Sequence, residues 1–194
     1  MDISALLGTV MSDDSVNGMS QTTAVSDAET RSILTAALPV LLGGALNQSN
    51  NSNTAAGFAN ALTQHSANNT SNLNSFFGNV DTDDGAKIVD HLFGANSDQI
   101  VAQIAGNSGV KKSDVKKVLA AAAPLLMSLL GQEVNTQQQT NSNAGVANIM
   151  GSLLGGGGNS TASLLAGLLG GGQQQQQQSN NSTSALSALL GLLK

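Results

Sequence analysis

Cysteine, tryptophan and tyrosine are absent from this chain of 194 residues, which has only four phenylalanines and two prolines. Without cysteine, the protein has no disulfide, no thiolate metal ligand and no cysteine nucleophile. Sandwiches and barrels of β-strands draw on aromatic and β-branched residues, and aromatics make up only 2 % of this chain. The abundant alanine and leucine are strong helix formers. We therefore expect an all-α core.

Charged residues are also few, at 10 % of the chain, and 12 acidic residues against 7 basic ones give a net charge of −5. This balance argues against a protein whose main task is to bind phosphate backbones. Residues 1–11 contain no lysine or arginine and so lack the basic start of a secretory signal. The most apolar run, residues 118–130, contains Pro124 and is shorter than the roughly 20 residues of a membrane-spanning helix. We expect a cytoplasmic protein without a transmembrane segment.

An internal repeat emerges when the chain is shifted by 85 residues against itself. Residues 1–46 then align without gaps with residues 86–131, and Pro39 falls on Pro124. Both copies also carry a Ser-Asp pair and an apolar set at matching positions. These shared features argue against a chance match between two alanine- and leucine-rich segments. We expect two related copies of one small helical unit.

The apolar spacing of the second copy predicts three helices, over residues 85–93, 98–105 and 114–130. Proline inside a helix removes one main-chain hydrogen bond and crowds the preceding turn, so we expect a kink or break at Pro124 and likewise at Pro39. A residue suited to N-capping precedes each helix. These capping candidates are Asp83 or Asp84, Ser97 and Ser113.

Glycines and amides mark the ends of these elements. Gly94 suits the C-terminal stop of the first helix, and residues 106–109 are typical of a turn. A fourth helix is expected after each copy, around residues 55–64 and 146–154. Two amide-rich stretches are expected to be polar connectors, residues 47–53 and 132–143.

The chain from residue 159 onward is of low complexity and includes six consecutive glutamines. Leucines interrupt it at helical spacing, at Leu164, Leu165, Leu168, Leu169, Leu186, Leu189, Leu190, Leu192 and Leu193. Isolated helices this short are marginal in water, so they must dock on the body or on another molecule, or stay disordered. We therefore divide the chain into a first helical unit with its connector (1–80), a second unit (81–158) and a tail (159–194).

The string Gly85-Ala-Lys-Ile-Val-Asp-His-Leu-Phe-Gly94 resembles the Gly-x-x-Ile-x-x-His-Ile-Phe-Gly element of the bacterial YidB-like proteins, catalogued as domain of unknown function 937. The alanine-rich stretch before Pro124 is also similar to that family. The resemblance covers most of residues 25–131 and implies a small, all-α, bacterial, cytoplasmic protein. It implies no established activity and no catalytic residue. The positions that carry it are Gly85, Ile88, His91, Phe93, Gly94 and Pro124.

The chain has two histidines, the side chains that titrate nearest neutral pH. His65 stands in a polar stretch and is expected to be solvated. His91 follows Ile88 by three residues and aligns with the apolar Leu6 of the first copy, so we expect a hydrogen-bonded packing histidine. A general acid–base site needs several titratable groups in one pocket, and no such pattern is recognisable. We predict no enzymatic activity, no catalytic residue and no small-molecule substrate.

An acidic run supplies the oxygens that Ca²⁺ prefers. Its members are Asp81, Asp83, Asp84 and Asp90. The run is too short for an EF-hand loop and lacks the terminal glutamate, so helix capping and solubility explain it better. Glycines 155–158 have no following Lys-Ser/Thr and no preceding strand, unlike a phosphate-binding loop. We therefore predict no metal and no cofactor.

Residues 99–119 have the spacing of a helix–turn–helix and look like the opening helices of histone-like bacterial DNA-binding proteins. Four of the seven basic residues stand here, Lys111, Lys112, Lys116 and Lys117. The first copy lacks this lysine cluster, and no other cationic patch supports contact with DNA. The favoured hypothesis is a non-enzymatic protein that interacts with a protein partner or with itself through apolar helical surfaces. Weak association with DNA or the nucleoid is the alternative.

Overall fold

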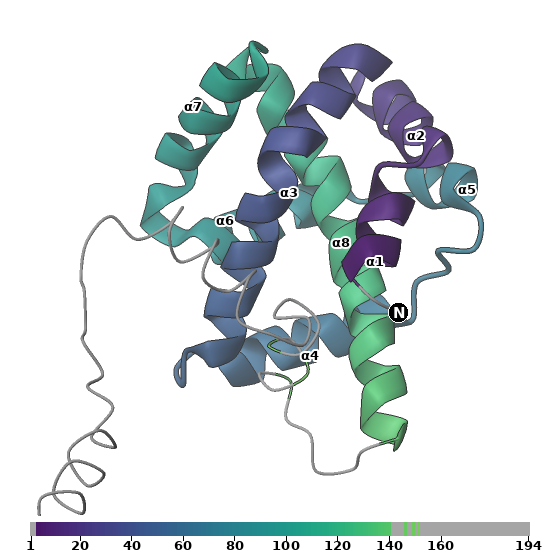
Figure 1. Cartoon of the computed structure of the whole chain (residues 1–194), viewed down its shortest axis with the longest axis vertical. Coiled ribbons are helices and arrows are strands. Elements are labelled where there is room, and N and C mark those ends of the chain that lie inside the picture. Colours follow the sequence, from purple (N-terminus) through teal and green to yellow (C-terminus); the bar gives the residue numbers. More distant parts are fainter. Residues whose placement is uncertain (1–2, 141–145, 147–148, 150, 152–194) are drawn as a thin grey trace, which may run out of the picture.

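The computed structural model describes residues 3–140, 146, 149 and 151 of the chain (Figure 1). Every regular element in these residues is a helix, which confirms the all-α expectation. The α-helices are α1 (Ile3–Val10), α2 (Asp13–Thr23), α3 (Asp27–Asn50), α4 (Ala55–Ser66), α5 (Leu73–Gly78), α6 (Thr82–Phe93), α7 (Ser97–Ser108) and α8 (Lys112–Thr140), and a short 3-10 helix, η1 (Gly94–Asn96), joins α6 to α7.

Helix α8 is the centre of the fold, and α3 crosses beside it (Figure 1). Helices α4 and α6 make the most extensive contacts with α8, and α1, α2, α3 and α7 also pack against it. Residues 118–131 are buried without interruption, as expected for a helix that is apolar on every face. One hydrophobic core joins residues from α1 to α8 and includes Ile149.

Residues 112–139 of α8 are long and apolar enough to cross a membrane, and they form the one such helix in the part of the chain that the structure describes. Of the window that meets this test, 89 % is buried inside the protein. The core helix of a globular protein meets the same criterion, so length and composition alone are weak evidence for a membrane span.

Both long helices continue through their prolines, so of the kink or break expected at Pro39 and Pro124 the break is wrong. A proline inside a helix costs about 3 kcal/mol, and burial of one leucine contributes roughly 1.5–3 kcal/mol. The buried side chains around Pro124 therefore offset the lost hydrogen bond. The Ser128 hydroxyl also donates to the Pro124 carbonyl over 2.7 Å.

None of the three expected N-caps is the residue that directly precedes its helix. Asp81 caps α6, its carboxylate accepting from the main-chain N–H groups of Asp83 and Asp84 at 2.9 and 3.0 Å. Ser97 lies inside α7 and donates to the Asp90 carboxylate instead. Helix α8 begins at Lys112, one residue before Ser113. The stop at Gly94 is confirmed, with a positive φ of 56°.

Several helices are longer than the sequence pattern predicts. Residues 106–108 belong to α7, and the left-handed Gly109 ends it. The connectors expected at 47–53 and 132–143 are helical up to Asn50 and Thr140, and each of these stretches contributes a buried polar side chain, Ser49 and Glu133. The fourth helix near residues 55–64 is confirmed as α4.

The second fourth helix, expected at 146–154, lies mostly outside the described residues, although residues 146, 149 and 151 are helical. The tail from residue 159 lies outside them altogether. Helix α5 has no counterpart in the sequence prediction. It contributes the buried Phe77, which packs against Gly18 of α2.

Candidate functional site

Two adjoining hollows lie between α4 and α6, with α8 as their floor. The apolar groove, of about 480 Å³, is lined chiefly by Phe58 and Ala61 of α4, Ile88 and Leu92 of α6, and Met127 of α8. The polar cleft, of about 530 Å³, is lined by amide, hydroxyl and charged side chains, among them those of Asn68, Ser75, Asn79 and Asp81. Four residues line both hollows, Gln64, His65, Asp84 and Lys87.

Two glycines allow the walls of these hollows, α6 and α4, to pack directly against α8. A β-carbon on Gly85 of α6 would lie 1.7 Å from the carbonyl oxygen of Ala120 on α8. A β-carbon on Gly131 of α8 would lie 2.1 Å from the carbonyl oxygen of Leu62 on α4. Only glycine permits backbones to approach so closely. These two crossings therefore fix α6 and α4 on either side of the site.

The His65 and Asp84 side chains face each other between the two hollows, with 3.4 Å from His65 Nε2 to an Asp84 oxygen. The Asn68 amide lies 3.4 Å from His65 Nδ1 and donates to the Ser128 hydroxyl at 3.0 Å. If Nδ1 accepts from that amide, Nε2 carries the proton that points at Asp84. The pair ties α4 to α6 across the site.

The prediction of a solvated His65 is wrong, because α4 extends through this residue and leaves its side chain 16 % exposed. A histidine paired with a carboxylate is also part of hydrolytic triads, which need a hydroxyl or thiol on the other ring nitrogen. In the described part of the chain that nitrogen faces the Asn68 amide. The arrangement therefore holds the imidazole ring in place between α4 and α6.

His91 lines the apolar groove. Its ring is exposed, so the expected packing role is wrong, whereas the expected hydrogen bond is present between Nδ1 and the Lys87 carbonyl at 2.7 Å. On α6 the buried face is taken by Ile88 and Leu92, and His91 lies outside it. The His91 carbonyl accepts from Gln48 of α3, at 2.6 Å.

Two of the residues that carry the family resemblance, Gly85 and Pro124, meet where α6 packs on α8. Ile88 and Phe93 are buried, Gly94 ends the helix, and Gly85 lies against Ala120 one turn before Pro124. Pro124 itself lines the polar cleft. This element therefore builds one wall of the site and fixes its distance from the floor.

The acidic run has structural partners. Asp81 caps α6, Asp84 faces His65, and Asp90 accepts from the Ser97 hydroxyl. Within residues 3–140, 146, 149 and 151, no three histidine, aspartate or glutamate side chains lie close enough to hold a metal ion.

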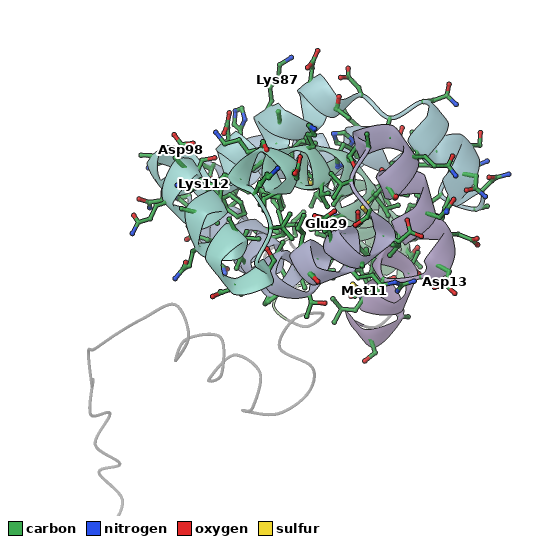
Figure 2. All side chains as sticks on the ribbon, turned by 90° about the horizontal axis from the view of Figure 1, so that it is seen from above. Met11, Asp13, Glu29, Lys87, Asp98 and Lys112 are labelled. Carbon is green, nitrogen blue, oxygen red and sulfur yellow. The ribbon has the colours of Figure 1, made fainter. Side chains whose placement is uncertain are left out.

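The lysine cluster lies at the start of α8, after the turn that follows α7. Lys116 pairs with Asp98 of α7 at 2.7 Å, and Lys117 pairs with Asp114 at 3.3 Å. A hydrogen bond and the charge of Lys116 lower the pKa of Asp98, and the same contacts raise the pKa of Lys116. Lys111 and Lys112 are exposed; Figure 2 labels Lys112 near Asp98. Two of the four lysines therefore face carboxylates, which reduces the positive charge of this surface.

Comparison with known protein families matches residues 5–133 to the family described as "Bacterial protein of unknown function (DUF937)". Neither the curated proteins nor the solved structures gave a match. The matched residues run from α1 into α8 and include both walls of the site, α4 and α6. Because the match covers well over half of the chain, and as the string from Gly85 to Gly94 predicted, the protein belongs to this bacterial family of unknown function.

Proposed function

We propose that this protein is a non-enzymatic interaction module that associates with further copies of itself, and that a leucine-rich helix of a second copy docks in the apolar groove. The observation that carries the proposal is the groove itself. Its walls are two fixed helices and its lining is chiefly apolar, with Phe58, Ile88, Leu92 and Met127 each less than a tenth exposed. Binding of an amphipathic helix in such a groove is a common mode of recognition.

The leucines of the tail supply the docking helix. Nine of them follow residue 159, and burial of each contributes roughly 1.5–3 kcal/mol. Even partial burial of the set would match the whole stability of a small domain, about 5–15 kcal/mol. Ile149 supports a tail near the body, since it is only 2 % exposed and belongs to the core cluster.

We also infer that residues 1–46 and 86–131 are two copies of one three-helix unit. An ion pair supports this, because Arg31 pairs with Asp13 just as Lys116 pairs with Asp98, and both partners are displaced by 85 residues. Helix α3 begins at residue 27 and α8 at residue 112, the same displacement. Packing is reciprocal as well, since α2 and α7 each contact both α3 and α8.

On this reading the site lies between the units proposed for residues 1–80 and 81–158. Helix α4 follows the first copy, and α6 opens the second. We place the protein in the cytoplasm, as the resemblance to its family implies. The Lys116 ion pair supports a structural role for that lysine over DNA contact, because its counterpart in the first copy, Arg31, makes the equivalent ion pair with Asp13.

The experiment fills the groove with a bulky side chain. Gly57 lines the apolar groove within α4, and a β-carbon there would meet no atom within 4 Å. The Gly57→Trp variant should therefore fold and obstruct the groove. Gly106→Trp is the matched control, since Gly106 is an exposed glycine of α7 that also has no atom within 4 Å of its β-carbon position.

Sedimentation velocity of the full chain, from micromolar to near-millimolar concentration, measures the outcome. We expect the unmodified protein and Gly106→Trp to associate as concentration rises, and Gly57→Trp to stay monomeric with an unchanged circular dichroism spectrum. A folded Gly57→Trp variant that associates like the unmodified protein would overturn the proposal. So would an unmodified protein that remains monomeric throughout.

A further inference from the structure

We propose that the segment that fills the apolar groove is residues 186–193, and that in dilute solution it is the molecule's own segment. The tail then regulates association by covering the groove until a second copy exchanges with it. This inference rests on the proposed function of the groove.

The first reason is the spacing of the leucines. Leu186, Leu189, Leu190 and Leu193 stand at i, i+3, i+4 and i+7, so in a helix they share one face over two turns. This is the anchor pattern of helices that bind in grooves. The earlier island, residues 164–169, has its leucines at i, i+1, i+4 and i+5, which spans little more than one turn.

The second reason is the match of charges at the end of the stripe. Lys194 directly follows Leu193 and is the one ionisable side chain after residue 151 in the sequence. The apolar groove opens into the polar cleft at Asp84, whose side chain is 42 % exposed. With the leucines in the groove, the Lys194 ammonium can lie toward Asp84.

The other charged groups around Asp84 leave this position favourable. Asp81 lines the same cleft and adds a second carboxylate. Lys87 lines both hollows, but its side chain points outward at the edge of the body (Figure 2). The His65 ring faces Asp84 at 3.4 Å and occupies one side of the carboxylate.

The third reason is that the chain after Gly151 is long enough to bring residues 186–193 to the groove. Ile149 is buried in the core, so the chain is held on the body two residues before Gly151. Residues 152–185 can extend by at most about 3.3 Å each, which is ample to bring the stripe to the groove of the same molecule. A tethered segment binds as if present at millimolar concentration. In micromolar solution a second copy is far more dilute, so the molecule's own segment occupies the groove.

The absence of cysteine from the chain permits a clean cross-linking test in the full-length protein. One variant carries Gly57→Cys in the groove and Ser187→Cys beside the leucine stripe. The matched control carries Gly106→Cys, on a distant exposed glycine, with the same Ser187→Cys. Both are oxidised at low micromolar concentration, and the products are separated under non-reducing conditions.

We expect the Gly57→Cys pair to form a disulfide within one molecule at least 10-fold faster than the control pair. Adding Leu189→Ser and Leu190→Ser should reduce that rate to the control rate. The same two serines should speed alkylation of a single Gly57→Cys thiol, because the segment no longer covers it. Alkylation provides a readout that does not depend on the geometry of a disulfide.

Equal disulfide rates for the two pairs, with alkylation unaffected by the serines, would overturn the inference. A cross-link mainly between two molecules at low micromolar concentration would overturn the assignment to the molecule's own groove. If the inference fails while Gly57→Trp still abolishes association, the proposed function of the groove stands. If Gly57→Trp leaves association unchanged, the proposed function itself is wrong.

Discussion

Gly85 on α6 lies so close to Ala120 on α8 that a β-carbon at position 85 would come within 1.7 Å of the Ala120 carbonyl oxygen. Ala120 is the residue whose carbonyl would accept from position 124 in a regular helix, and Pro124 has no N–H to donate. Helix α6 thus crosses α8 at Gly85, next to the Ala120 carbonyl that Pro124 leaves without its helical donor. Two residues of the family resemblance, Gly85 and Pro124, meet at this crossing.

Gly85→Ala should destabilise the protein although alanine favours helices. The new methyl group would collide with backbone, which cannot rotate away, and such overpacking costs about 1–3 kcal/mol. Urea denaturation measures the loss in the free energy of unfolding. Gly106→Ala is the control and should raise stability by about 0.5–1 kcal/mol, because its methyl group meets open space and only helix propensity changes. Equal effects of the two substitutions would contradict the close crossing.

His65→Ala should lower the free energy of unfolding by about 1 kcal/mol, since it removes the contact with Asp84 and a hydrogen-bond partner of Asn68. His91→Ala should change it by less than about 0.5 kcal/mol, because His91 is exposed. Urea denaturation of both variants checks this difference. A larger effect of His91→Ala would contradict the assignment of His65 as the tie between α4 and α6.

The pH dependence of stability should reflect the Asp98–Lys116 pair. Its lowered Asp98 pKa, relative to the usual 3.8, adds stability that is present above that value and is lost as pH falls through the lowered pKa. The raised Lys116 pKa adds stability below 10.5 that is lost as pH rises through the raised value. Asp98→Asn should therefore lower the urea midpoint slightly at neutral pH and leave it unchanged in strong acid. A difference that persists in acid would assign the effect to something other than this pair.

The lysines of α8 should not support DNA binding near physiological ionic strength, because Asp98 and Asp114 neutralise two of them. A duplex titrated by fluorescence anisotropy at several salt concentrations checks this. If the lysines did contact phosphates, the logarithm of affinity would fall by about 0.9 per contact for each tenfold rise in salt. Tight binding abolished by changing Lys111, Lys112, Lys116 and Lys117 to Gln would instead favour the DNA hypothesis.

Truncation after Gly158 should leave the body folded and make the protein more monomeric. The described core ends with Ile149, so the deletion removes the leucine-rich tail without removing a described core residue. Circular dichroism and sedimentation velocity measure the two effects. Unfolding of the truncated protein would show that the tail belongs to the core. If the truncated protein is folded and associates as before, the interaction surface must lie on the helical body and not on the tail.

Local sequence determined the helical class, the position of α4 and the stop at Gly94. These depend on interactions within a few residues, such as helix propensity and the positive φ that glycine accepts. Membership of the family was likewise readable from the string between Gly85 and Gly94. The exact caps were less predictable, since several neighbouring aspartates can accept the same N–H groups and geometry selected Asp81.

Tertiary structure decided the rest. Helix α8 continues through Pro124 because burial on every side offsets the lost hydrogen bond, and this burial depends on helices far away in sequence. His65 meets Asp84 only because α4 and α6 are both held on α8 by close glycine crossings. Propensity and spacing describe the chain over one or two turns, whereas the groove arises from distances between helices that no local pattern encodes.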